Sequence, residues 1–235
     1  MTRKVDVASK LYVGTRKGLF ILVRKNGGWD IAETKFLGEP VSAVYSDGQT
    51  TLAALDLGHF GPKLWRREGD GEWQEMQVPT FPKKPDDADD DPHPWSVGRI
   101  WNINPAGEDG AFWAGTMPGG LFRSDDNGAT WALNDALWMM PDRRKWMGVA
   151  GGEQPGLSSV LVDPKNADKL TIGVSCAGIW QTEDGGVSWT NIGDGFDNEY
   201  MPPDQRHDPI AQDIHQIAHC KAHPEVIWCQ HHSRI

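Results

Sequence analysis

The sequence has few cysteines and no long hydrophobic run. Only three cysteines occur in the 235 residues, and Cys176, Cys220 and Cys229 lack the spacing of a metal site. We therefore expect free thiols in a reducing compartment and predict a cytoplasmic location. No apolar run approaches the roughly 20 residues that a membrane helix needs, and residues 1–10 lack the apolar segment of a signal peptide. The sequence thus predicts a protein without a membrane span.

Positive charge is also scarce. Lys and Arg number 23 against 33 Asp and Glu, which gives a formal net charge of −10. A protein that binds phosphate backbones needs surplus Lys and Arg on its surface. The charge balance therefore argues against nucleic acid as a partner.

Residues that form turns and aromatic side chains are abundant instead. The chain has 27 Gly, 16 Pro and 12 Trp. Such a composition suits short strands joined by tight turns better than a helical bundle. It predicts an all-β fold.

The sequence contains an internal repeat. Residues 111–131 read AFWAGTMPGGLFRSDDNGATW, and residues 169–189 read KLTIGVSCAGIWQTEDGGVSW. Each gives a strand, a turn of small residues, a second strand and an acidic Gly-containing turn closed by Trp. Residues 11–29 and 51–73 carry weaker versions, and a further apolar run precedes each later unit. Four short strands per unit at this period are typical of a β-propeller blade.

The acidic turn is the most specific motif, and two copies fit the pattern S/T-x-D-x-G-x-S/T-W. The matching positions are Ser124, Asp126, Gly128 and Trp131 in one copy and Thr182, Asp184, Gly186 and Trp189 in the other. An Asp carboxylate can accept hydrogen bonds from backbone N–H groups of its own turn, Gly permits positive φ, and Trp can pack between blades. A structural role for these residues is therefore favoured over a catalytic or calcium-binding role.

These two turns resemble the Asp-box, or BNR, repeat of sialidases, sortilin-type receptors, xyloglucan hydrolases and related β-propellers. The resemblance extends over residues 10–235 and implies one propeller domain over residues 1–235. The expected blades are residues 5–36, 40–78, 95–135 and 157–193, with a partial fifth blade at 213–235. The fifth unit stops where its third strand begins, which favours part of a longer propeller over an irregular four-bladed ring. Open blade edges would permit self-association.

Propeller topology places the long connections between blades on the face opposite the Asp boxes. These connections are residues 79–96, 135–157 and 193–213, and loops of such length are usually functional or disordered. We predict a ligand site there, or a wet channel lined by the same groups. The candidate ligand-binding residues are His59, His93, Trp95, Arg99, His215, His231 and His232, and the candidate catalytic residues are Glu153 and Asp213.

Two features of this face could bind a cation. Asp213 and His215 share one face of a strand, but no recognised metal signature is present, and neither a metal nor another cofactor is expected. The acidic loop at residues 86–91 lacks the EF-hand pattern and is interpreted as a solvated loop.

One loop combines aromatics with cations. Trp138 and Trp146 flank Arg143, Arg144 and Lys145. Such a surface could stack on sugars or receive a partner protein, or its aromatic side chains could cap the core between blades.

Two function classes remain open. The resemblance implies a carbohydrate-binding or hydrolysing site, of the sialidase or xyloglucanase kind, with Glu153 and Asp213 as the carboxylates. The Arg-Ile-Pro motif of sialidases is absent, since the nearest string is Arg99-Ile100-Trp101, and this chain alone is expected to be inactive. The alternative is a non-catalytic propeller that serves as a scaffold for protein binding or complex assembly.

Overall fold

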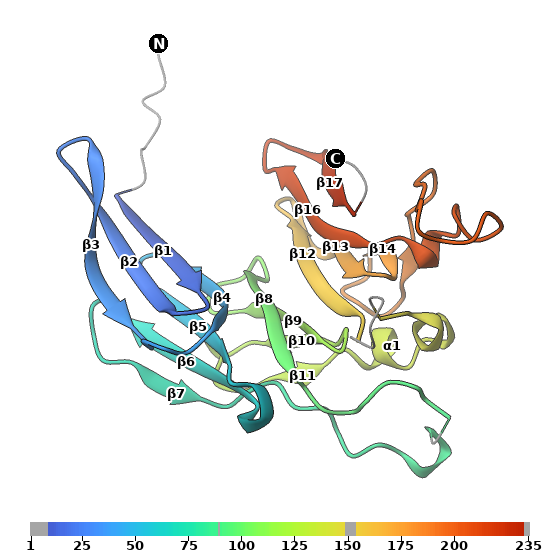
Figure 1. Ribbon diagram of the computed structural model, residues 1–235, viewed down its shortest axis with the longest axis horizontal. Coiled ribbons are helices and arrows are strands. Elements are labelled where there is room, and N and C mark those ends of the chain that lie inside the picture. The colour runs from blue at the N-terminus through green and yellow to red at the C-terminus, as the bar shows by residue number, and fades with distance from the viewer. Residues whose placement is uncertain (1–8, 89, 149–153, 233–235) are drawn as a thin grey trace.

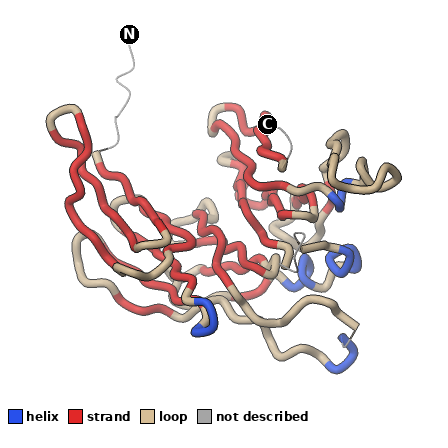
Figure 2. The backbone as a smooth tube through the Cα atoms, viewed as in Figure 1, coloured by secondary structure: helices blue, strands red, loops and turns tan. Residues whose placement is uncertain are grey.

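The computed structural model describes residues 9–88, 90–148 and 154–232. These residues form five antiparallel sheets that follow one another in chain order (Figure 1). The described part is thus nearly all β, as predicted, and several of its sheets have four strands. Figure 2 shows that helix is confined to short segments in the connections between strands.

The first sheet has three strands, which pair as hairpins. They are β1 (Lys10–Thr15), β2 (Gly18–Lys25) and β3 (Gly28–Lys35). The last sheet has two, β16 (Ile214–Cys220) and β17 (His223–His231).

The three middle sheets have four strands each. The second sheet contains β4 (Val41–Ser46), β5 (Thr50–Asp56), β6 (Pro62–Glu68) and β7 (Gln74–Met76). The third contains β8 (Arg99–Pro105), β9 (Phe112–Met117), β10 (Leu121–Ser124) and β11 (Ala132–Leu133). The fourth contains β12 (Gly156–Asp163), β13 (Asn166–Ser175), β14 (Gly178–Thr182) and β15 (Thr190–Asn191).

The helices are all short and lie in connections. They are η1 (Gly58–Phe60), η2 (Asp86–Ala88), α1 (Asp135–Trp138), η3 (Pro141–Lys145) and η4 (Pro209–Ala211). No helix in the described ranges has the length and apolar character that crossing a membrane requires.

The hydrophobic core lies between successive sheets. One buried cluster fills each of the four interfaces, and the two largest flank the third sheet. Strand β9 of the third sheet contributes to both of these clusters. Phe112 and Ala114 pack toward the second sheet, whereas Trp113 between them packs toward the fourth. Alternate residues of a strand face opposite sides, so a strand with neighbours on both faces is a continuous apolar run.

The two ends of the sheets form two different surfaces. On the turn face, the turns at residues 124–131 and 182–189 meet the connections at 106–111 and 163–168, as Asn127 N donates to Gly110 O and Gly185 N to Asp168 O. On the loop face, the connections between sheets meet the turns between second and third strands, as Gly178 N donates to Gln212 O. The candidate ligand-binding residues belong to the loop face.

Candidate functional site

The carboxylate of Asp184 on the turn face is occupied by its own turn. Its Oδ1 atom accepts hydrogen bonds from Thr182 Oγ1 at 2.7 Å, Val187 N at 3.0 Å and Ser188 N at 2.9 Å. Its Oδ2 atom accepts from Ser188 Oγ at 2.5 Å. The hydrogen bonds from Ser188 and Thr182 hold the pKa of Asp184 far below its ordinary value.

The turn of Asp126 repeats this arrangement. Asp126 accepts from Thr130 Oγ1 at 2.6 Å, Thr130 N at 2.8 Å and Ser124 Oγ at 2.9 Å. The Thr130 hydrogen bonds lower the pKa of Asp126 to about 2. Gly128 has φ +78° and the corresponding Gly186 has φ +93°, a conformation that disfavours side chains with a Cβ. Each carboxylate thus orders a turn.

The tryptophans that close these turns pack against neighbouring sheets. Trp131 contacts the cluster between the second and third sheets, and Trp189 contacts the cluster between the third and fourth. Trp189 Nε1 also donates to Asn134 Oδ1 at 3.2 Å. The two residues therefore occupy corresponding positions in adjacent sheets.

On the loop face, His93 and Trp95 belong to a buried network around Asp91. Arg143 donates from Nη1 to Asp91 Oδ1 at 2.6 Å and from Nη2 to Oδ2 at 2.5 Å. Trp95 Nε1 donates to Oδ2 at 2.9 Å and His93 N to Oδ1 at 3.1 Å. The Arg143 guanidinium also lies 4.1 Å from the ring centroid of Trp138. We call these five residues the Asp91 network.

The Asp91 network overturns the solvated-loop interpretation for its central residue. The Asp91 side chain is 0% exposed and that of Arg143 2% exposed. Burial acts to raise the pKa of Asp91, but hydrogen bonds from Arg143, His93 and Trp95 lower it to about 2. Trp138 and Trp146 are buried as well, in agreement with the core-capping alternative for that loop.

Two other candidates lie elsewhere on this face. Arg99 Nε donates to Asp56 Oδ2 at 2.6 Å, which joins the second and third sheets. His59 is exposed in η1, with its ring centroid 4.2 Å from that of Phe60. The structure does not bring His59, His93, Trp95 and Arg99 to one common partner.

The remaining described candidates gather at the last sheet. Asp213 precedes β16, His215 lies on it, and His232 follows β17. His232 N donates to Asp213 O at 3.0 Å, which extends the β16–β17 pairing and brings both side chains together. His231 is buried and its ring stacks on Phe196 at 5.6 Å between centroids. Glu153, the other catalytic candidate, lies outside the described residues.

The two oxygens of Asp213 have different partners. Oδ1 accepts from Ser175 Oγ at 2.8 Å and from Cys176 N at 3.2 Å. Oδ2 lies 3.2 Å from His215 Nε2 and 3.2 Å from His232 Nδ1. Burial acts to raise the pKa of Asp213, but the Ser175 hydrogen bond and the adjacent His215 outweigh it, so the pKa lies below its ordinary value.

Cys176 next to this carboxylate is kept protonated. Burial and the adjacent Asp213 raise the pKa of the Cys176 thiol to about 12. A thiol at this pKa is a poor nucleophile at neutral pH.

A pocket of about 430 Å³ opens beside Asp213, and we call it the Asp213 pocket. It is lined by Met147, Gly148, Cys176, Asn198, Tyr200, Met201, Ala211, Asp213 and His232. The lining combines residues from four chain segments, one of which is the long connection before β16. Sequence reasoning identified the segment but missed Asn198, Tyr200 and Met201, which follow no periodic pattern.

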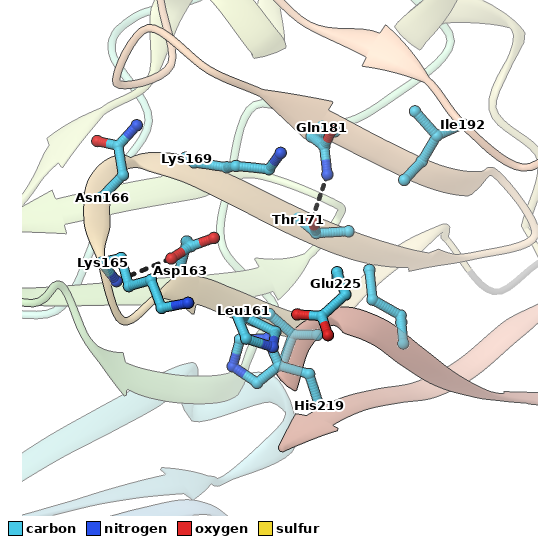
Figure 3. A pocket seen from close by; sticks show the side chains of 12 residues that line it. Leu161, Asp163, Lys165, Asn166, Lys169, Thr171, Gln181, Ile192, His219 and Glu225 are labelled. Atoms are coloured by element: carbon cyan, nitrogen blue, oxygen red, sulfur yellow. Dashed lines mark hydrogen bonds between the residues drawn. The ribbon is translucent and has the colours of Figure 1, made fainter. Parts of the chain in front are cut away.

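A second groove, of about 480 Å³, lies between the fourth and fifth sheets near the turn face (Figure 3). Lys165 and Lys169 come from the β12–β13 hairpin, whereas His219 and Glu225 come from the last sheet. Lys169 Nζ is already 2.9 Å from Glu183 Oε1. This groove thus contains opposite charges, and the predicted ligand-binding residues do not line it.

No protein-family model matches the chain, and no curated protein matches it either. Solved structures do resemble it. A GH74 xyloglucanase from Xanthomonas campestris is 18% identical with a TM-score of 0.50, over 77% of this chain and 27% of that one. YCF48 from Cyanidioschyzon merolae is 14% identical with a TM-score of 0.54, over 91% of this chain and 58% of that one.

A third similar structure is the extracellular domain of the putative hybrid two-component system BT4673 from B. thetaiotaomicron. It is 13% identical with a TM-score of 0.56, over 94% of this chain and 24% of that one. The chain thus spans about a quarter of two of these proteins and over half of the third. Likeness at this level of identity supports a fold of the β-propeller kind.

Proposed function

We propose that this chain is part of an Asp-box β-propeller that binds a protein partner, and that the Asp213 pocket receives an apolar side chain of that partner. The observation that carries the proposal is the lining of the pocket. Tyr200 is 75% exposed and Met147 39% exposed, although both are large and apolar. The flexible side chain of methionine adapts its shape to a partner, and both methionine and tyrosine are enriched at protein–protein interfaces.

The polar groups of the pocket favour a peptide over a sugar. Asn198 Nδ2 donates to Ala211 O at 2.7 Å, and Asn198 Oδ1 accepts from Tyr200 N at 3.2 Å. The Oδ1 atom of Asp213 is likewise engaged. A sugar ring would need several available hydrogen-bonding groups beside its stacking aromatic, and this lining offers few.

Glycoside hydrolysis receives less support. Most glycosidases need two carboxylates across the scissile bond, and Asp213 is the only carboxylate among the described residues that line the pocket. Its lowered pKa also makes it unsuited to donate a proton at neutral pH. The likeness to a xyloglucanase bears on fold alone.

The test presents the purified chain to two kinds of probe, a phage-displayed random peptide library and an array of xyloglucan and sialylated oligosaccharides. We expect selected peptides to share an apolar residue. Met201→Asp and Tyr200→Ala should weaken peptide binding by about 10-fold or more. Val187→Asp, which alters an exposed apolar residue on the turn face, is the matched control and should leave binding unchanged. Binding of oligosaccharides without peptide selection would overturn the proposal.

A further inference from the structure

Three ligand atoms at the edge of the Asp213 pocket form a nearly equilateral triangle. Asp213 Oδ2 lies 3.2 Å from His215 Nε2 and 3.2 Å from His232 Nδ1, and the two nitrogens are 3.2 Å apart. Ligand atoms bound at about 2.0–2.1 Å to a tetrahedral Zn²⁺ lie about 3.3 Å from one another. The triangle therefore has the dimensions of one face of a zinc coordination sphere.

Protons alone satisfy this triangle poorly. One hydrogen bond can satisfy only one edge of the triangle, and each neutral imidazole supplies a single N–H group. If both nitrogens donate to Oδ2, two N–H groups crowd each other at the 3.2 Å nitrogen–nitrogen contact. A cation above the centre would interact with all three lone pairs at once. The two imidazole rings are also inclined at 88°, so they can approach one ion from different directions.

The surroundings hold the carboxylate in place for this role. Asp213 is 6% exposed, and Ser175 Oγ and Cys176 N bind its Oδ1 atom, so Oδ2 alone is directed at the histidines. Ligating carboxylates in metal sites are characteristically hydrogen-bonded through their other oxygen. The hydrogen bond from His232 N to Asp213 O fixes the separation of the two strands at the same point.

From these observations we infer that Asp213, His215 and His232 bind one divalent transition-metal ion, with Zn²⁺ as the favoured ion. Two imidazoles and one carboxylate suit zinc and its first-row neighbours better than Ca²⁺ or Mg²⁺, which prefer oxygen ligands. Asp213 and His232 also line the pocket, so a fourth position can be taken by water or by a group bound there. The observations that support the metal site do not depend on the proposed peptide partner.

The test titrates the untagged, EDTA-treated chain with Co²⁺, whose visible absorption reports a four- or five-coordinate site, and then displaces the cobalt with Zn²⁺. We expect one equivalent of Co²⁺, displaced by Zn²⁺ but not by Ca²⁺. Asp213→Asn, His215→Gln and His232→Gln should each abolish the absorption bands. Ser175→Ala should weaken binding by about 10–100-fold, because it removes the shorter of the two hydrogen bonds that hold Asp213 Oδ1.

His219→Gln is the matched control, since His219 lies on the same strand outside the triangle. It should bind Co²⁺ as the parent chain does. His215 and His232 are exposed, so their variants are expected to fold, and circular dichroism checks this. Equal Co²⁺ binding by His215→Gln and the parent, or no bands in the parent, would overturn the inference. Peptide binding is measured separately without metal, so either proposal can fail alone.

Discussion

Asp91 and Asp213 are both buried carboxylates on the loop face, but their partners differ. Asp91 is paired with a buried arginine, whereas Asp213 lies beside two exposed histidines. Asp91 is paired bidentately with Arg143, and its carboxylate oxygens also accept hydrogen bonds from Trp95 Nε1 and His93 N. Asp213 has one oxygen anchored by the protein and the other directed at two exposed histidines. Burial alone therefore does not mark a functional carboxylate; the partners decide.

The difference follows from the chemistry of the partners. Arg is permanently charged and its planar fork matches both carboxylate oxygens, which suits a fixed structural pair. Histidine can be neutral and can donate a lone pair to a metal ion. We therefore expect changes at Asp91 to act on folding and changes at Asp213 to act on binding.

The largest effect is expected for Arg143→Met. It leaves the Asp91 carboxylate buried without its countercharge, which should lower the free energy of unfolding by about 3–5 kcal/mol. Urea denaturation measures this loss. The double variant Asp91→Leu/Arg143→Met removes both charges and should recover much of the stability. An Arg143→Met chain as stable as the parent would show that the Asp91–Arg143 ion pair does not stabilise the fold.

A smaller effect is expected from pH. The pKa of Asp91 is lowered to about 2 in the folded chain. Ionised Asp91 therefore contributes on the order of 2 kcal/mol to the free energy of unfolding. This contribution is complete above the ordinary pKa and is lost as the pH falls from about 4 to about 2. Asp91→Asn should remove this part of the pH dependence of unfolding. If the plots of unfolding free energy against pH for the parent and for Asp91→Asn remain parallel between pH 4 and 2, Asp91 does not titrate as described.

A still smaller effect is expected on the turn face. Asp184→Ala removes the acceptor of three hydrogen bonds from Val187 and Ser188 and should lower the thermal midpoint by a few degrees. Cobalt binding should not change. Asp125→Ala is the control, because that exposed carboxylate pairs with half-buried Arg123 rather than with its turn. Loss of cobalt binding in folded Asp184→Ala would contradict a purely structural role.

The smallest effect on folding is expected at the pocket. Tyr200→Ala removes a side chain that is 75% exposed and should leave the thermal midpoint of the metal-free chain nearly unchanged. Differential scanning calorimetry without ligand makes the comparison. A large fall would mean that Tyr200 supports the loop rather than faces a partner.

The fold could be predicted from sequence because its signals are local and repeated. Trp131 and Trp189 close turns that share one sequence pattern. In the strands before these turns, apolar residues either alternate with polar ones or form a continuous run, depending on whether one or both faces of the strand pack against a neighbouring sheet. The approach of Asp213 to His215 could be predicted because residues two positions apart in an extended segment share a face, and Asp213 directly precedes β16.

The rest of the site depends on tertiary packing. His232 joins Asp213 through strand pairing, Ser175 comes from the adjacent sheet, and Tyr200 comes from an irregular loop. No spacing rule connects these three. The sequence of the acidic loop predicts a solvated segment, because nothing in it indicates that Arg143, 52 positions away, pairs with Asp91.

The most direct test of the distinction between the two carboxylates is anomalous diffraction at the zinc edge from crystals of the chain grown with Zn²⁺. We expect one strong peak about 2.0–2.2 Å from Asp213 Oδ2, His215 Nε2 and His232 Nδ1, and none at Asp91. A peak that avoids this triangle, or density showing the three side chains apart with no ion between them, would contradict it.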